Sequence, residues 1–268
     1  MTGPRPGSPG YRPGVIRPRR SFRRAVTGVA GLTVAAAFVL AAEIQLARTE
    51  PRLAPVDLDL DVDGPGPRMV WVGDSTAAGV GASAAGEALP RQVAAGLGHP
   101  VSVHVLAVSG ATVADVLRHQ VARAAALRPD VVLVSVGAND TTHLTARGEF
   151  RRDYGELVSR LSGSAGAATS AGARGPEVVV LGVPDMGAIP RLAQPLRAVA
   201  GWRGEHLDAE IAAVAAASGA RYVDIAGSTG PAFRRHPDRY FAGDRYHPSD
   251  AGYALWARAV VGVLNDHR

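Results

Sequence analysis

The chain has 268 residues, of which 47% are hydrophobic, so it is long enough for one domain with a sizeable core plus an appendage. It contains no Cys, which excludes disulfides, thiolate metal sites, a Cys nucleophile and a lipidated Cys. The net charge of +5 does not indicate a nucleic-acid-binding face. Seven of the 29 basic residues, all of them Arg, lie in residues 1–24 without any acid, which leaves 22 Arg against 24 acidic residues in the remainder.

The N-terminal region predicts a membrane segment behind a basic tail. Residues 1–24 are rich in Pro, Gly and Arg and are expected to be disordered. Residues 25–42 carry no charge and no Pro, and with the four residues after Glu43 they form an apolar segment over 25–47 that is long enough to span a bilayer. The preceding Arg cluster predicts a cytoplasmic N-terminus and an extracytoplasmic domain. An uncleaved signal anchor is favoured over a cleaved signal, which would make the domain secreted.

Residues 48–67 are expected to be a Pro- and Asp-rich linker. The alternation of Asp with Leu and Val over residues 57–63 is compatible with a strand. Pro and Gly lie on both sides of it, which favours an extended acidic tether instead.

From residue 68 to residue 268 the chain alternates apolar strands with amphipathic helices, which predicts one α/β domain. Strands are expected at Met69–Val72, Val101–Val108, Val131–Val136, Val178–Val183 and Tyr222–Ile225. Helices are expected at Leu89–Leu97, Val113–Leu127, Phe150–Leu161, Leu207–Ala217 and Ser249–Leu264. Such an alternation predicts a five-stranded parallel sheet with helices on both faces, and ligands bind such sheets beyond the carboxyl ends of the strands.

Ser75 and His247 are the candidate nucleophile and base. Ser75 follows the first strand directly, and a serine hydroxyl becomes a nucleophile when a base accepts its proton. Asp244 lies three residues before His247, close enough to hold the imidazole Nδ1 on a short turn. Ser249 is expected to cap the following helix, which would place His247 at a rigid junction.

Two further strand ends supply candidate hydrogen-bond donors. The side-chain amide of Asn139 and the backbone N–H groups of Gly110 and Ser75 can donate to a developing oxyanion. Asp140 is expected to brace its loop rather than to act chemically. Of the other His residues, only His143 is a candidate for lining a pocket, because it follows Asn139 closely.

These segments, in this order, resemble the SGNH, or GDSL-like, hydrolase family. The similarity lies in Gly73-Asp74-Ser75, in Ser109-Gly110, in Gly137-Ala138-Asn139-Asp140 and in Asp244-Arg245-Tyr246-His247. Thr76 departs from the family pattern, which has Leu there. The resemblance covers about residues 68–265. It implies a flavodoxin-like α/β/α sandwich without cofactor or metal, with Ser75, His247 and Asp244 as the catalytic residues and Ser75, Gly110 and Asn139 as oxyanion donors.

The expected function is therefore that of a membrane-tethered serine hydrolase that cleaves carboxylic esters outside the cytoplasm. An acyltransferase or a carbohydrate deacetylase using the same site is the alternative, and a non-catalytic envelope binding module is a weaker one. The expected partners are a small-molecule, lipid or glycan acyl ester and the membrane, but no nucleic acid. The segment Pro184–Trp202 is expected either to wall an acyl pocket or to pack on the core as a loop and helix.

Overall fold

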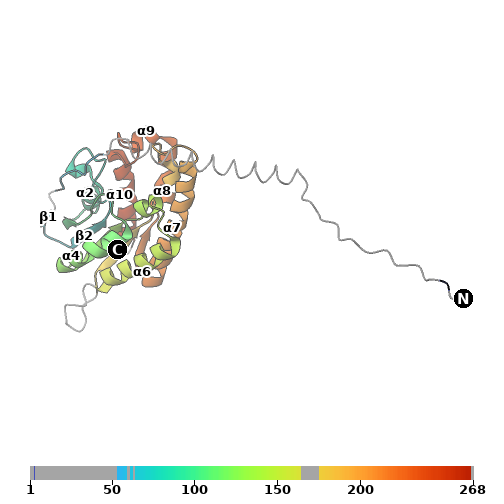
Figure 1. The fold of residues 1–268 in the computed structure, drawn as a ribbon. Coiled ribbons are helices and arrows are strands. Elements are labelled where there is room, and N and C mark those ends of the chain that lie inside the picture. Colours follow the sequence, from blue (N-terminus) through green and yellow to red (C-terminus); the bar gives the residue numbers. More distant parts are fainter. Residues whose placement is uncertain (1–2, 4–52, 59–60, 63, 164–174, 267–268) are drawn as a thin grey trace.

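The computed structural model describes residues 3, 53–58, 61–62, 64–163 and 175–266 (Figure 1). The predicted membrane segment over residues 25–47 and nearly all of the basic tail lie outside this part, as does most of the Gly/Ala/Ser-rich stretch before Gly175. In the residues that are described, no helix combines the length and the apolarity that a bilayer span requires.

The sheet contains the five parallel strands that the sequence predicts, and a short sixth strand at one edge. The strand order is β1-β3-β2-β4-β5-β6, and β1 alone is antiparallel to its neighbour. The strands are β1 (Asp61–Val62), β2 (Arg68–Gly73), β3 (Ser102–Val105), β4 (Val131–Ser135), β5 (Glu177–Leu181) and β6 (Arg221–Val223).

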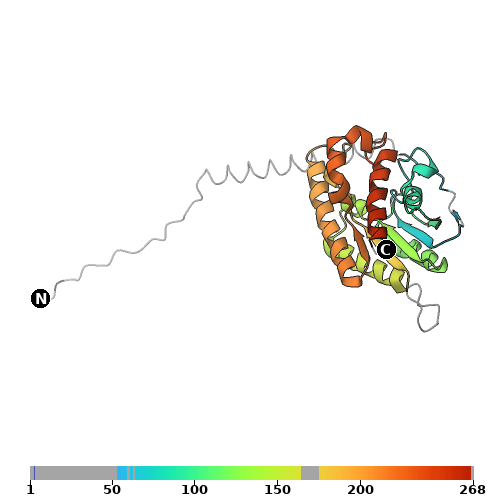
Figure 2. The same ribbon diagram turned by 180° about the vertical axis from the view of Figure 1, so that it is seen from behind.

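Helices cover both faces of this sheet, so the α/β/α sandwich is confirmed (Figures 1 and 2). The helices are α2 (Leu89–Gly96), α3 (Val113–His119), α4 (Val121–Ala126), α5 (Ala138–Thr142), α6 (Arg147–Ser162), α7 (Leu196–Ser218), α8 (Ile225–Arg235), α9 (Pro237–Tyr240) and α10 (Asp250–Asn265), with short 3₁₀ turns at Ala85–Glu87 and Met186–Ala188. On one face α2 packs against α10, and on the other α6 packs against α3, α4 and α7. Right-handed crossovers require this arrangement. The connection from β2 to β3 runs toward one edge of the sheet and the connection from β3 to β4 runs toward the other, so their helices lie on opposite faces.

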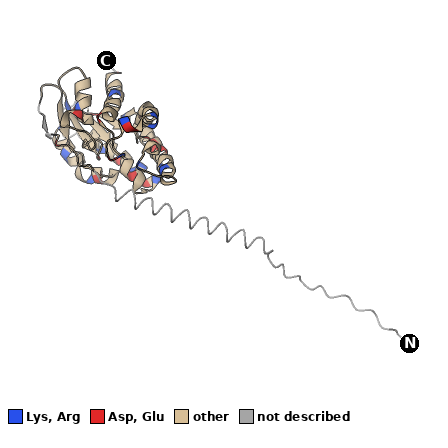
Figure 3. Ribbon diagram, turned by 90° about the horizontal axis from the view of Figure 1, so that it is seen from above, with Lys and Arg blue, Asp and Glu red and all other residues tan. Residues whose placement is uncertain are grey.

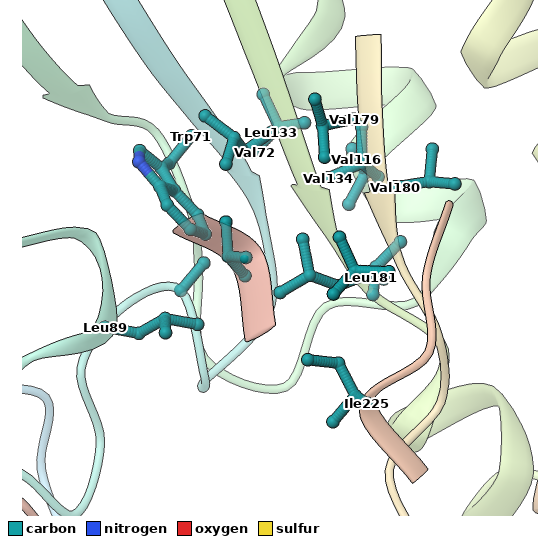
Figure 4. Packing of buried hydrophobic residues seen from close by; sticks show 14 of the residues in the cluster. Trp71, Val72, Leu89, Val116, Leu133, Val134, Val179, Val180, Leu181 and Ile225 are labelled. Carbon is teal, nitrogen blue, oxygen red and sulfur yellow. The ribbon is translucent and has the colours of Figure 1, made fainter. Parts of the chain in front are cut away.

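The core explains why the central strands are continuous apolar runs. Val134 and Val180 are fully buried because both faces of a parallel sheet are covered by helices. Figure 4 shows Trp71 beside Leu89 on one side of the sheet, and Leu181 above Ile225 further along it. Each such side chain contributes about 1.5–3 kcal/mol when fully buried. Charged residues of both signs are interspersed over the described elements (Figure 3).

The structure corrects three of the predicted elements. Asp61–Val62 pairs with β3, so this part of the linker is a strand and not a free tether. The predicted helix Val113–Leu127 is two helices, because the chain breaks at Gln120, whose side chain is turned inward and buried. The last strand ends at Val223, because Asp224 accepts a hydrogen bond from the Gly227 N–H and begins α8 instead.

Candidate active site

The backbone of Gly73 and Asp74, at the end of β2 and just before Ser75, is held in one conformation. Gly73 has φ +147°, and a Cβ there would lie 2.0 Å from the Ser135 carbonyl oxygen, so only Gly fits. The Asp74 N–H donates to that same oxygen at 2.9 Å. The Gln120 side chain binds both polar backbone groups of Gly73, accepting from its N–H at 2.8 Å and donating to its carbonyl at 2.9 Å. The end of β2 therefore has little freedom to move Ser75.

Ser75, His247 and Asp244 form one continuous chain of hydrogen bonds. His247 Nε2 lies 2.9 Å from Ser75 Oγ, and His247 Nδ1 lies 2.6 Å from Asp244 Oδ2. The second carboxylate oxygen of Asp244 accepts the backbone N–H groups of Tyr246 and His247, each at 3.0 Å. The structure thus brings together three residues that lie up to 172 positions apart in the sequence.

The electrostatics of this chain favour an ionised Asp244. Burial by itself would raise the pKa of the Asp244 carboxyl. The hydrogen bonds from the His247 side chain and from the backbone of His247 and Tyr246 outweigh burial and hold that pKa below its usual value. A carboxylate in this position keeps the proton of a neutral imidazole on Nδ1 and leaves the Nε2 lone pair facing the hydroxyl.

His247 is held at the start of α10, as the sequence predicts. Its backbone carbonyl accepts the Ala242 N–H at 2.8 Å, and Ser249 caps α10 by accepting the Gly252 N–H at 3.2 Å. Gly81, in the turn after Ser75, approaches this loop so closely that a Cβ would lie 2.4 Å from the Pro248 carbonyl oxygen. The loop carrying the base is therefore packed directly against the loop carrying the hydroxyl.

The predicted oxyanion donors line one cavity together with Ser75 and His247. Asn139 lies in α5, and its Nδ2 donates one hydrogen bond to the Ala111 carbonyl at 2.9 Å. A primary amide has two N–H bonds, so the second is left for a substrate oxygen. In the described part of the chain, the backbone N–H groups of Ser75 and Gly110 have no hydrogen-bond acceptor.

Asp140 braces its loop, as expected. It is 1% exposed, and its carboxylate accepts the Val113 N–H at 3.1 Å and the Thr145 hydroxyl at 3.0 Å. Its hydrogen bonds tie α5 to α3, which holds Asn139 in place. His143 is exposed and lines the same cavity as Asn139, so its assignment as a pocket residue is confirmed.

Asp74 and Thr76, the residues on either side of Ser75, belong to a buried polar cluster. Asp74 Oδ1 accepts from the backbone N–H and the hydroxyl of Thr76, at 3.0 and 2.9 Å. The Thr76 hydroxyl also lies 2.7 Å from Ser135 Oγ. Burial raises the pKa of Asp74 to about 6, despite these hydrogen bonds. Thr76, where the family pattern has Leu, thus gives this carboxylate a hydroxyl donor that Leu cannot supply.

Two cavities meet at Ser75 and His247. The larger, of about 280 Å³, contains the oxyanion donors and has apolar walls from Leu192, Leu196 and Val199. The smaller, of about 40 Å³, is lined by apolar side chains that include Met186, Ile189 and Trp256. The segment Pro184–Trp202 lines both cavities, and it also packs on the core through buried residues such as Met186 and Ile189, so both expected roles apply.

Gln120 and the Thr76–Ser135 hydroxyl pair are the site residues that sequence reasoning missed. The only signal for Gln120 was an uncharged amide inside a predicted helix, which does not distinguish it from a surface residue. Among the residues that the structure describes, no group of three or more His, Asp or Glu could hold a metal ion. The arrangement can move a proton from Ser75 to His247 while hydrogen-bond donors face the adjoining cavity.

Comparisons with known proteins identify a matching family and a curated relative. A model of the GDSL-like lipase/acylhydrolase family matches residues 71–255. The GDSL-like esterase Rv1075c of Mycobacterium tuberculosis is 37% identical over 200 residues, which are 72% of this chain and 60% of that protein. The chain therefore spans less than two thirds of the length of this curated relative.

Solved structures show the same fold at low identity. A lipase/acylhydrolase from Enterococcus faecalis is 20% identical, with a TM-score of 0.58, over 74% of this chain and 94% of that one. The acetylxylan esterase Axe2 from Geobacillus stearothermophilus is 19% identical, with a TM-score of 0.55, over 75% and 95%. A protein described as a putative SGNH hydrolase, from Slackia heliotrinireducens, is 22% identical, with a TM-score of 0.55, over 75% and 100%.

Proposed function

The chain belongs to the GDSL-like lipase/acylhydrolase family, and from this premise we propose that it is a serine esterase that cleaves carboxylic esters through an acyl-enzyme on Ser75. The observation that carries the proposal is the hydrogen-bond chain from Ser75 through His247 to Asp244, which opens into a cavity containing Gly110 and Asn139.

The first half of the reaction forms the acyl-enzyme. The Ser75 hydroxyl gives its proton to His247 Nε2 while its oxygen bonds to the ester carbonyl carbon. The negative charge that develops on the carbonyl oxygen is stabilised by the Asn139 amide and by the backbone N–H groups of Ser75 and Gly110. The carbon–oxygen bond to the alcohol then breaks, and the proton on His247 passes to the departing oxygen.

The second half returns the enzyme to its starting state. A water molecule gives a proton to His247 Nε2 and bonds to the acyl carbon. The bond to Ser75 Oγ then breaks, Ser75 recovers the proton from His247, and the carboxylic acid leaves. Asp244 stays ionised through both halves, which is what its lowered pKa supports.

The size of the cavities supports a short or medium acyl ester as substrate. A volume of about 280 Å³ is just below the range of roughly 300–1,000 Å³ that small-molecule sites occupy. The walls formed by Leu192, Leu196 and Val199 favour an apolar group over a free glycan.

The proposed site of action is outside the cytoplasm, with the domain tethered to the membrane by residues 25–47. The support is the Arg-rich stretch before an apolar segment of sufficient length.

A panel of p-nitrophenyl esters of increasing acyl length tests the proposed function. We expect hydrolysis of short and medium esters, falling for long chains, and loss of turnover in Ser75→Ala. Parallel reactions with glycerol and with a disaccharide would identify an acyltransferase, because the acyl group would then appear on the acceptor. Equal turnover by wild type and Ser75→Ala would refute the assignment.

A further inference from the structure

Four of the five large apolar side chains that are exposed in the described residues lie at or near the catalytic cavity, whereas the fifth, Leu53, does not line it. Leu144 and Val199 line the cavity and are 61% and 36% exposed. Val108, 53% exposed, directly precedes Ser109 and Gly110, which line it as well. Trp202, 59% exposed, lies about one turn beyond Val199 on α7. We call Val108, Leu144, Val199 and Trp202 the apolar rim. Apolar residues scattered singly on a surface need no explanation, whereas a group around an opening marks a surface that meets another phase or partner.

The segments that carry the apolar rim are positively charged. Residues 106–114, 141–146 and 186–204 contain three Arg residues and no Asp or Glu. Of the acids that directly flank these ranges, Asp115 pairs with Arg118 and Asp185 pairs with Arg234. Asp140 is buried, which leaves Glu205 as the exposed one. Two of the three Arg residues within the ranges are held by neutral backbone oxygens, which leaves their charge uncompensated. Arg203 donates to the carbonyls of Thr141 and Thr145, at 3.1 and 2.8 Å.

Arg197 donates in the same way to the carbonyls of Leu192 and Pro190, at 2.6 and 3.0 Å. An apolar rim among cations matches an anionic lipid surface, where phosphates lie above an apolar layer. An exposed Trp is also typical of the interface between water and lipid.

The chain enters the domain against the turn that follows Ser75. A Cβ on Gly79, in the turn after Ser75, would lie 2.9 Å from Val56 Cγ2 and 3.6 Å from Leu58 Cδ2. Leu58 is 3% exposed, so the segment before β1 is packed onto the domain here. Between the predicted membrane segment, which ends at residue 47, and Leu58 the chain can extend by at most about 40 Å. That reach is short enough to hold the catalytic edge of the sheet close to a bilayer.

We infer that the apolar rim docks on the surface of an anionic bilayer, so that the catalytic cavity opens toward the lipid. The docking depends only on the described rim and its charge. A second consequence, that esters reach Ser75 from the lipid surface, rests on the proposed function.

Trp202 provides a direct reporter of this docking. The chain has three Trp residues, and the other two, Trp71 and Trp256, are buried. The full chain, carrying Ser75→Ala so that no substrate is consumed, is mixed with vesicles of phosphatidylglycerol and phosphatidylcholine with brominated acyl chains. We expect the emission of Trp202 to shift to the blue and to be quenched, and Trp202→Phe to lack this quenched component. Vesicles of phosphatidylcholine alone should quench less.

A matched pair of variants separates rim docking from tethering by the N-terminal segment. Val199→Asp places a charge in the rim and should abolish the quenching while the chain still floats with the vesicles. Ala216→Asp is exposed on the same helix about 25 Å further along and should keep the quenching. Circular dichroism verifies that both variants fold.

Three results would overturn the inference. Unquenched Trp202 in chains that float with the vesicles would show that the rim faces away from the lipid. Equal loss of quenching in Val199→Asp and Ala216→Asp would show that the rim has no special role. A blue shift that appears without vesicles and grows with protein concentration would show that a second copy covers the rim instead. Because Ser75→Ala removes the proposed chemistry from the outset, none of these results depends on whether the chain is an esterase.

Discussion

The buried carboxyl of Asp74 should make the stability of the fold depend on pH between about 4 and 6. Burial is the main cause that raises its pKa from 3.8 to about 6. Each factor of ten in a proton dissociation constant corresponds to about 1.4 kcal/mol. Ionising Asp74 therefore costs ~3 kcal/mol more in the folded state than in the unfolded state. Asp74 is 2% exposed, so solvent screening reduces this figure little.

The sign follows from proton binding. Between pH 3.8 and about 6 the folded state holds a proton on Asp74 that the unfolded state has released. The contribution of this group to the free energy of unfolding is therefore greatest below pH 3.8, and it is lost as the pH rises through about 6. Asp74→Asn cannot ionise and should show no such loss.

The assay compares the free energy of unfolding of wild type and Asp74→Asn, by urea denaturation of the full chain at a series of pH values. The emission of the buried Trp71 and Trp256 reports unfolding. The difference between the variant and wild type should move in favour of the variant by ~2 kcal/mol from pH 4 to pH 7, because the unfolded carboxyl is already more than half ionised at pH 4. Any constant cost of the Asn amide cancels, because only the change with pH is used. A difference that does not vary with pH would show that Asp74 is not buried as a carboxyl, and would refute the reasoning.

Four further outcomes can be measured, three that follow from the site and one that follows from the N-terminal sequence. Asn139→Ala should lower kcat by roughly 10²–10³-fold with KM nearly unchanged, because the hydrogen bond from Asn139 to the substrate oxygen strengthens in the transition state. His143→Ala, in the same cavity, should affect mainly KM. A KM effect alone in Asn139→Ala would contradict the oxyanion role. Asp244→Asn should lower kcat by roughly 10³–10⁴-fold, because the wrong imidazole tautomer is favoured. Turnover of Asp244→Asn at the wild-type rate would count against the proposal. In wild type the pKa of Asp244 is held low, so a steady-state pH–rate profile above about pH 5 should show no loss of activity from protonation of this carboxylate. Protease added to intact, wall-stripped cells should digest the domain, and protection until lysis would place it in the cytoplasm.

The parallel sheet and the site residues could be predicted from the sequence because their signals are local. Residues 131–134 are continuously apolar because the strand is buried on both faces, and Ser75, Gly110 and Asn139 follow strands whose carboxyl ends meet at one edge. His247 could be found because Asp244 lies three residues before it and Ser249 begins a helix after it. In each case the signal lies in a short stretch of sequence, and the parallel sheet brings these stretches together at one edge.

What could not be predicted depends on partners far away in the chain. Gln120 breaks a helix because its amide bonds to the backbone of Gly73, 47 positions earlier. Asp61–Val62 is a strand because the edge of β3 is available to pair with it, although the flanking Pro and Gly argue against a strand locally. The apolar rim could not be predicted either, since its four exposed side chains come from three segments that are far apart in the sequence and form no pattern there.

Intact-mass spectrometry of the protein after brief incubation with a p-nitrophenyl ester tests the central claim most directly. The account predicts a covalent adduct of the mass of the acyl group, located on the peptide that contains Ser75, and no adduct in Ser75→Ala. His247→Ala should form the adduct far more slowly, because no base accepts the Ser75 proton. Ester hydrolysis that proceeds at an undiminished rate in Ser75→Ala, or an adduct that forms on another residue, would contradict it.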